Sequence, residues 1–216
     1  MLTDHCLLAG HHFAYERGRV LHRDLSQNNL MFLRTEDGGV QGILNDWDLS
    51  SEVDDRGEVP ASTANHRTGT VPYMARELLD DNPPPHLYRH DLESLFYVLV
   101  WAAIHYDLNK KRKLKTVDAV KNWDAGNFDS AKQAKDSFFY ANGADKVFGN
   151  VRQEFKTLEA AWLDPLWDLF RDAFWSIPRG QNDSYDWRTL GGRLTFNKFM
   201  TTIKREPRTF HPHSVT

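Results

Sequence analysis

Ten consecutive residues near the middle of the chain, Leu95 to Ile104, are all apolar or aromatic. A helix that is apolar on every face does not lie on a surface, because other parts of the protein have to cover each of its sides. The run is also shorter than the ~18 residues that a membrane-spanning helix needs. The sequence therefore predicts a globular protein whose core contains this helix.

The composition is that of an ordinary globular protein. The 216 residues suffice for one substantial core or two small ones, and 40% of them are hydrophobic. A net charge of −3 gives no general reason to expect nucleic-acid binding. The single Cys6 excludes an internal disulfide and a cysteine-based zinc site, and the N-terminus does not have the basic start of a signal peptide. We therefore expect a cytoplasmic or nuclear protein that binds neither nucleic acid nor membranes.

Most of the chain has the pattern of helices. Apolar residues fall at helical spacing in residues 2–17, and Gly18 is suited to end that helix. The segments "NLMFL" and "QGILND" read as two short strands on either side of the turn "RTEDGG". The predicted fold class is mainly α with a small β-hairpin, an α+β fold. Further helices are expected at 73–81, 116–123, 129–141, 151–175 and 195–204.

Two polar segments stand out against this pattern. Residues 49–70 are charged and aperiodic, and a segment of that length inside a compact domain is usually functional or disordered. The stretch "VLHRDLSQNNLMF" is rich in Asp and Asn, which most often form turns. However, Asp24 and Asn29 precede the expected hairpin and Asp46 follows it. Oxygen ligands for Mg²⁺ and a carboxylate at an attacking hydroxyl are what phosphoryl transfer requires.

Four motifs occur in the order that protein kinases share. "HRDLSQNN" is similar to the catalytic loop H-R-D-x-x-x-x-N, and "NDWDLS" stands where D-F-G is expected. "GTVPYMARELL" is similar to the end of an activation segment, and "YRHDLESLFYVLVW" to the central helix of casein-kinase-type enzymes. Four such elements in order are far more specific than one motif. The chain resembles the C-terminal lobe of a eukaryotic-type protein kinase, and specifically the fungal-type protein kinase family.

The resemblance implies a kinase-like C-terminal lobe at residues 1–205 and a C-terminal tail at 206–216. The N-terminal lobe, with its glycine-rich loop and lysine, is absent from the sequence. We therefore expect ATP to be held from one side, and a partner to cover the face that this lobe would occupy. The implied parts are a catalytic loop at 22–29, an activation segment at 46–77, a buried central helix at 91–106 and a family insert at about 110–150.

The resemblance also assigns roles to individual residues. Asp24 accepts the proton of the substrate hydroxyl, with His22, Arg23 and Ser26 as further catalytic residues. Asn29 and Asp46 hold Mg²⁺. The residues that bind the nucleotide are Asn29, Met31 and Asp46. The implied cofactors are ATP and Mg²⁺, and the implied partners are ATP and a protein substrate.

Some residues depart from the family pattern. Ser26 replaces the lysine that is usual two residues after the catalytic Asp, and Asp48 replaces the glycine of D-F-G. Arg76 replaces the proline of A-P-E, but Glu77 is kept. In the family that glutamate pairs with a distant arginine, and Arg179 and Arg188 are both candidates.

Further expectations concern regulation and packing. In the family, Arg23 contacts a phosphorylated activation segment, and Thr70 favours Ser/Thr substrates. Asp91 is expected to be buried and to accept hydrogen bonds from the backbone at His22 and Arg23. The basic stretch "KKRKLK" at 110–115 is interpreted as a solvated loop, with a nuclear signal or a phosphate-binding patch as the alternatives. The residues available for phosphorylation are Ser62, Thr63, Thr68 and Thr70, and the histidines expected at or near the surface are His5, His11 and His12.

Three functions are compatible with these motifs. The first is a Ser/Thr protein kinase of the fungal type, and the second is an inactive pseudokinase fragment that acts as an interaction module. The third, a small-molecule phosphotransferase, is disfavoured because such enzymes do not have a segment like "GTVPYMARE". The residues leave the first two open.

Overall fold

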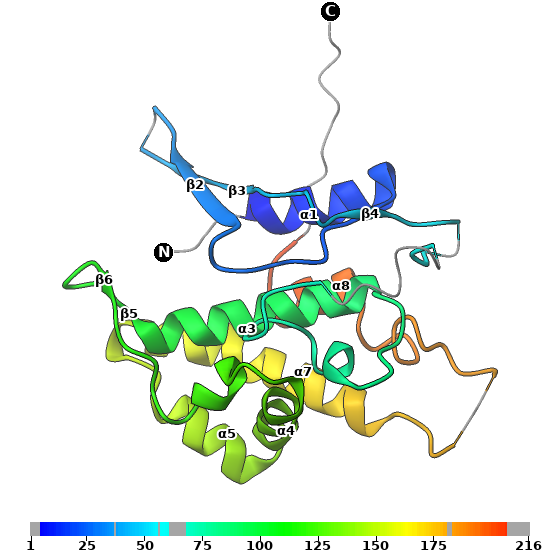
Figure 1. The fold of residues 1–216 in the computed structure, drawn as a ribbon. Helices are drawn as coiled ribbons and strands as arrows, with labels where there is room; N and C mark the ends of the chain where they lie inside the picture. Colours follow the sequence, from blue (N-terminus) through cyan, green and yellow to red (C-terminus); the bar gives the residue numbers. More distant parts are fainter. Residues whose placement is uncertain (1–4, 37, 56, 61–67, 181–182, 207–216) are drawn as a thin grey trace, which may run out of the picture.

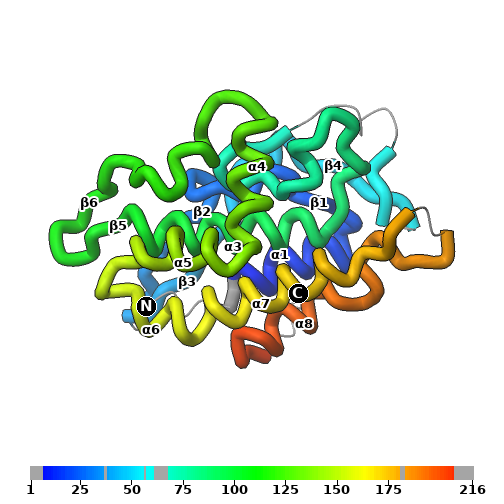
Figure 2. The backbone as a smooth tube through the Cα atoms, turned by 90° about the horizontal axis from the view of Figure 1, so that it is seen from below, coloured from blue at the N-terminus to red at the C-terminus, as the bar shows by residue number. Residues whose placement is uncertain are grey.

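The computed structural model describes residues 5–36, 38–55, 57–60, 68–180 and 183–206. Its elements form two layers around one central helix, α3 (Tyr88–His105), as Figure 1 shows. Helix α1 (His5–Gly18) and two small strand pairs lie on one side of α3. The helices of the C-terminal half lie on the other side, which is the side seen in Figure 2. The fold is mainly α with small antiparallel strand pairs, as predicted.

Helix α3 confirms the prediction that came from the apolar run. Every one of its residues except Ala102 is buried. It starts at Tyr88, three residues before the expected start at Asp91, and ends at His105. Phe96 stacks on Phe138 and Phe170 from the C-terminal half, with ring centroids 6.0 and 5.2 Å away. Because aromatic side chains bury large apolar areas, these contacts fix α3 in the centre of the core.

The predicted hairpin is present directly after the first polar stretch. Strands β2 (Leu30–Arg34) and β3 (Val40–Leu44) pair antiparallel, with Leu30 opposite Leu44. A second pair, β1 (Val20–Leu21) with β4 (Ser51–Glu52), places part of the polar segment 49–70 in a regular element. The expectation of a segment without structure was therefore wrong at Ser51 and Glu52, because their partner strand lies 30 residues away and gives no local pattern.

The C-terminal half differs from prediction mainly in where helices break. The expected helix at 116–123 is reduced to a short 3₁₀ turn at Lys121–Asp124. The one expected at 129–141 ends at Phe138, and a second helix that was not predicted starts at Ala141. Gly143 explains the tight connection, because a Cβ at this position would overlap the backbone carbonyl of Ser137. The remaining elements are η1 (Arg76–Leu79), β5 (Tyr106–Asp107), β6 (Arg112–Lys113), η2 (Lys121–Asp124), α4 (Phe128–Phe138), α5 (Ala141–Phe148), η3 (Gln153–Phe155), α6 (Lys156–Leu158), the π-helical η4 (Glu159–Leu163), α7 (Asp164–Trp175) and α8 (Phe196–Thr202).

The core positions the polar segments on the central helix. One large cluster joins α3 to α1, α4, α7 and α8, and a smaller one joins Met74, Leu78 and Leu79 to Ala131 of α4. The end of the predicted activation segment is therefore packed against the predicted family insert. None of the helices in the described part of the chain combines the length and apolar composition of a bilayer crossing.

Candidate functional site

Asp24 and Asn29 form the centre of the candidate site. The Asn29 side-chain amide donates to the Asp24 carbonyl at 2.9 Å and to its Oδ2 atom at 3.4 Å. Thr70 donates to the Asp24 Oδ1 atom twice, from its backbone N–H at 2.9 Å and from its hydroxyl at 2.8 Å. The structure thus brings together residues separated by 46 positions in the sequence. The carboxylate of Asp24 is oriented by hydrogen bonds to both of its oxygens.

The hairpin brings Asp46 back to this centre. The pairing of β2 with β3 continues beyond the strands, because the Asn45 backbone N–H donates to the Asn29 carbonyl at 2.9 Å. Asp46 follows directly and is exposed, as is Asp48. Asp46 and Arg23 have positive φ angles of 59° and 70°, which are uncommon for residues other than glycine and cluster at functional sites.

His22 connects the two motifs. Its Nδ1 atom accepts from the Asp24 backbone N–H at 3.3 Å, so its Nε2 atom carries the proton and donates to the Asn45 carbonyl at 2.9 Å. Trp47 packs edge-on against the His22 ring with centroids 4.7 Å apart. Burial lowers the pKa of His22, although the bond to Asn45 acts in the opposite direction. A neutral His22 thus positions Asp46 relative to Asp24.

Asp91 has the place that the sequence predicted. Its side chain is fully buried, and its Oδ2 atom accepts from the backbone N–H groups of His22 at 3.1 Å and Arg23 at 3.5 Å. The ring of His11 donates to the same oxygen at 2.9 Å and that of His86 to Oδ1 at 2.7 Å. Burial disfavours the charged form, but the charge and hydrogen bonds of the two histidines outweigh it and hold the pKa of Asp91 well below its usual value.

The two histidines were not found from the sequence. His11 is only 1% exposed, so the expectation of a surface or partly buried residue was wrong for it. Its partner lies 80 positions away, and no local pattern indicates such a contact. His12 is half-buried, and the side chain of His5 lies outside the described residues.

The other predicted site residues are distributed around the loop. The Arg23 guanidinium donates to the Ser51 hydroxyl at 2.5 Å and is buried. Ser26 is 2% exposed, and its carbonyl accepts from the Asn29 backbone N–H at 3.1 Å. Met31 is half exposed on β2. The roles assigned to these residues remain predictions.

The predicted partner of Glu77 was wrong. Neither Arg179 nor Arg188 pairs with it; Arg89, in the first turn of α3, does so at 2.6 Å. The His90 Nδ1 atom accepts from the Leu87 backbone N–H, so its Nε2 atom donates to Glu77 at 3.3 Å. Burial lowers the pKa of His90 to about 3. Burial alone raises the pKa of Glu77, but the His90 bond and the Arg89 charge hold it well below its usual value.

Lys135 of α4 holds the end of the predicted activation segment, and no local sequence pattern indicated this contact. Its ammonium group is fully buried and donates to the carbonyls of Val71 at 2.9 Å and Met74 at 2.5 Å. The Tyr97 ring lies 4.4 Å from it. Burial lowers the pKa of Lys135 to about 7, and the nearby Glu93 opposes that shift.

Arg76, which stands where the kinase motif has a proline, makes several contacts of its own. It pairs with Asp136 of α4 at 2.6 Å and lies 3.8 Å over the ring of Phe174. Its backbone N–H donates to the buried Glu93 at 2.9 Å.

Of the residues considered for phosphorylation, Ser62 and Thr63 lie outside the described residues, and Thr70 is bonded to Asp24.

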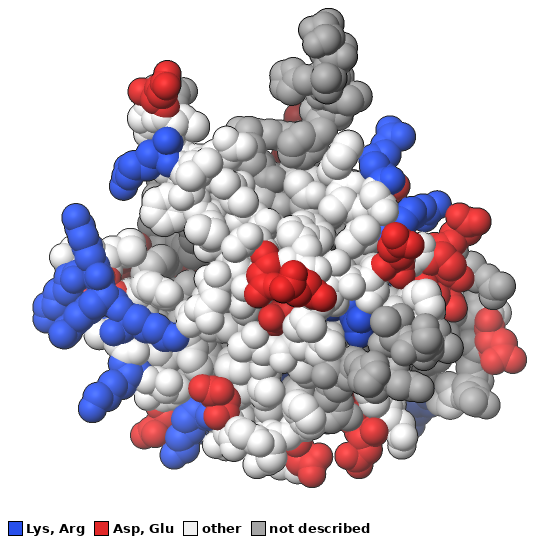
Figure 3. All heavy atoms as spheres, turned by 45° about the horizontal axis from the view of Figure 1, so that its top comes forward, with Lys and Arg blue, Asp and Glu red and all other residues white. Residues whose placement is uncertain are grey.

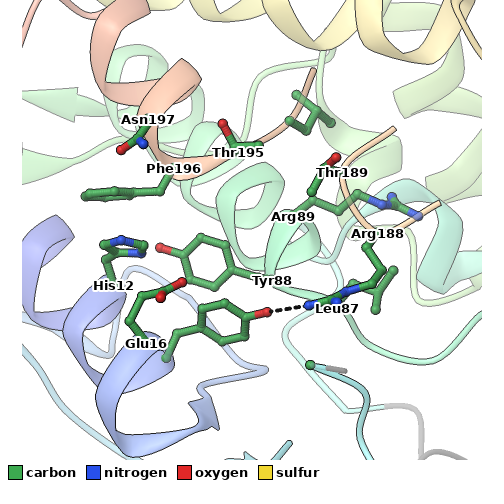
Figure 4. A pocket seen from close by; sticks show the side chains of 13 residues that line it. His12, Glu16, Leu87, Tyr88, Arg89, Arg188, Thr189, Thr195, Phe196 and Asn197 are labelled. Carbon is green, nitrogen blue, oxygen red and sulfur yellow. Dashed lines mark hydrogen bonds between the residues drawn. The ribbon is translucent and has the colours of Figure 1, made fainter. Parts of the chain in front are cut away.

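The hollow shown in Figure 4 lies away from Asp24. The crevice between Asp24, Gly69 and Thr70 has no room for a water molecule. A hollow of about 340 Å³ lies elsewhere, between α1, the start of α3 and residues 188–197 (Figure 4). There the guanidinium of Arg188 donates to the Tyr15 hydroxyl at 3.4 Å. This hollow contains none of the predicted site residues, whereas Asp46 and Met31 are exposed to solvent.

The donor set at the candidate site suits Mg²⁺. Among the described residues there is no group of three or more His, Cys, Asp or Glu that would hold a metal alone. Asn29 and Asp46 instead offer amide and carboxylate oxygens. The Asn29 amide nitrogen is bonded to Asp24, which leaves its oxygen for a cation. Mg²⁺ prefers such hard ligands and takes the rest of its coordination from waters and substrate phosphates.

Comparison with families of known proteins agrees with this geometry. No curated protein matches the chain. A family described as fungal protein kinase matches residues 4–103, somewhat less than half of the chain. That segment contains Asp24, Asn29, Asp46 and Asp91, together with most of α3. Residues 4–103 are therefore similar to the fungal protein kinase family.

Proposed function

We propose that the protein is an ATP-dependent kinase of the fungal type that transfers a phosphoryl group to Ser or Thr of a protein substrate. The observation that supports this most directly is the arrangement at Asp24, whose carboxylate is oriented by Asn29 and Thr70. A general base has to be positioned within hydrogen-bond reach of the proton that it accepts. Asp24, partly exposed and oriented at both oxygens, would be the base that accepts the proton of a substrate hydroxyl.

The other residues would hold the reactants and the loop. Asn29 and Asp46 would hold Mg²⁺, which neutralises charge on the phosphates of ATP. Met31, half exposed on β2, would contact the nucleotide. The loop would be positioned by His22, Arg23 and Asp91 through the bonds described above. Ser26 is buried and would support the loop from within, where its carbonyl accepts from the Asn29 backbone N–H. The class of substrate, Ser/Thr rather than Tyr, rests on the family resemblance at Thr70.

Phosphotransfer from labelled ATP tests the proposal. The chain is incubated with Mg²⁺-ATP and a mixture of Ser-, Thr- and Tyr-containing peptides, in parallel with Asp24→Asn and the distant control Asp145→Asn. The Asp24 variant keeps shape but not charge, so kcat should fall ~10²–10⁴-fold while the control remains unchanged. Labelling of Tyr peptides alone would refute the substrate class.

Binding of Mg²⁺-ATP, measured by calorimetry, separates the kinase from an inactive interaction module. Binding that is weakened by Asp46→Asn, together with transfer that depends on Asp24, supports the kinase. The kinase function would be contradicted if Asp24→Asn transferred phosphate at a rate within a few-fold of the parent. It would also be contradicted if the chain showed neither transfer nor nucleotide binding.

A further inference from the structure

The hairpin β5–β6 has a concentrated positive charge that the proposed catalysis does not use. Its four consecutive cations, Lys110 to Lys113, are all exposed, and Lys115 follows. Figure 3 shows a group of blue side chains at this edge of the molecule. Within the described part of the chain, none of these cations lies within 4 Å of a carboxylate. The protein as a whole carries a charge of −3, so this concentration is local.

Nearby acids offset only part of the charge of the hairpin, because Asp107 is the acid that interacts electrostatically with Lys110 and Arg112. Asp107 and Glu154 lie at its base, and both pair with Arg152, at 3.3 and 3.0 Å. The loop between the strands is closed by a hydrogen bond, because the Lys110 backbone N–H donates to the Asp107 carboxylate at 2.9 Å. The cations therefore project from a defined loop with their charges available to another molecule.

The base of the hairpin is attached to the candidate active site. The Tyr106 hydroxyl donates to the side chain of Gln27 at 3.4 Å, and Gln27 lies three residues after Asp24. Lys113 lies 6.0 Å over the ring of Trp101, and this ring also packs edge-on against Tyr73 of the "GTVPYMARE" segment. The hairpin thus contacts the loop that carries Asp24 directly, and it is linked to the segment that carries Thr70 through Trp101 of α3.

A substrate segment bound at the hairpin would lie beside the loop that carries Asp24, because Tyr106 contacts Gln27 of that loop.

We propose that hairpin β5–β6 is a docking surface for an acidic segment of the protein substrate, beside its acceptor Ser or Thr. That this segment belongs to a substrate rests on the proposed kinase function. A nucleic acid is a poorer fit, because its backbone requires a longer basic stripe than one hairpin, and Asp24, Asp46 and Asp48 lie on the adjoining loops.

The test measures binding rather than transfer. Fluorescent peptides carry one Ser and a block of four Asp or Glu, or the same block as Asn and Gln, and their anisotropy is followed with the whole chain. The hairpin variant is Lys110→Gln, Lys111→Gln, Arg112→Gln and Lys113→Gln. The matched control is Lys146→Gln, Arg193→Gln, Lys198→Gln and Lys204→Gln, which removes the same charge from exposed positions elsewhere.

The acidic peptide should bind the parent and the control equally, and the hairpin variant roughly ten-fold more weakly. Its binding should also weaken as salt rises, because exposed charges are screened. Equal loss in both variants, or no loss in the hairpin variant, would overturn the proposal. So would displacement of the acidic peptide by a short RNA or by anionic vesicles that bind the hairpin more tightly.

Failure of this proposal is distinguishable from failure of the kinase function. Hairpin-dependent binding of the acidic peptide without any phosphotransfer would keep the docking surface and remove only its description as a substrate site. Transfer that depends on Asp24 but is equally fast to acidic and neutral peptides would keep the kinase and remove the docking surface.

Discussion

Replacing Asp91 with alanine should destabilise the protein by about 3–5 kcal/mol, the range for a buried ion pair that loses one partner. The carboxylate lies between α1, the loop before α3 and the predicted catalytic loop, and it accepts four hydrogen bonds. Alanine provides no acceptor for any of them. The effect should therefore appear whether or not the protein has kinase activity.

The magnitude follows from the individual bonds. The His22 backbone N–H, at 3.1 Å, would be left buried and unpaired, and such a group costs about 1–3 kcal/mol. The bonds from His11 and His86 are shorter, and bonds to a charged group contribute about 1.5–3 kcal/mol each. The bond from Arg23 is at the limit of hydrogen-bond distance and adds little. These hydrogen bonds share one carboxylate, so their contributions do not add fully. The expected total is therefore about 3–5 kcal/mol, lower than the sum of the single contributions.

Urea unfolding followed by tryptophan fluorescence measures the effect. Asp145→Ala, an exposed position on α5, is the control and should change the free energy of unfolding by less than about 0.5 kcal/mol. Asp91→Asn, which keeps two polar atoms, should fall between the two. An Asp91→Ala variant as stable as the parent would refute the argument, since the loop would then not depend on this carboxylate.

The remaining predictions concern pH and catalysis. His90 takes up a proton near pH 6.5 in the unfolded chain but only near pH 3 in the folded state, so the free energy of unfolding falls as the pH is lowered from 7. His90→Gln should reduce this loss between pH 7 and pH 5 by about 2 kcal/mol, measured by urea unfolding. The folded pKa of Lys135 is also lowered, to about 7, so the parent should gain roughly 1–2 kcal/mol between pH 7 and 8.5, and Lys135→Met should not. Thr70→Val removes the hydroxyl bond to Asp24 and should lower kcat about ten-fold or more, with a conservative Thr70→Ser restoring it.

Local patterns were sufficient for the main elements. The apolar run 95–104 predicted the buried helix α3, because a helix without a polar face has only one stable environment. Two short apolar segments on either side of a turn predicted the β2–β3 hairpin, since its register depends on neighbouring residues. The breaks in the C-terminal half were not predicted, because the close approach at Gly143 depends on how two helices pack.

At the candidate site, the sequence by itself determined the residue types and their order: Asp24, Asn29 and Asp46 at the ends of a hairpin, and a buried Asp91. Only the tertiary structure decided the partners. His11 on Asp91, Arg89 on Glu77 and Lys135 on the Val71 carbonyl join residues 12 to 80 positions apart. A buried charge has to be paired, but any of several residues of suitable charge satisfies that need, and the packing of the helices selects which one lies within reach.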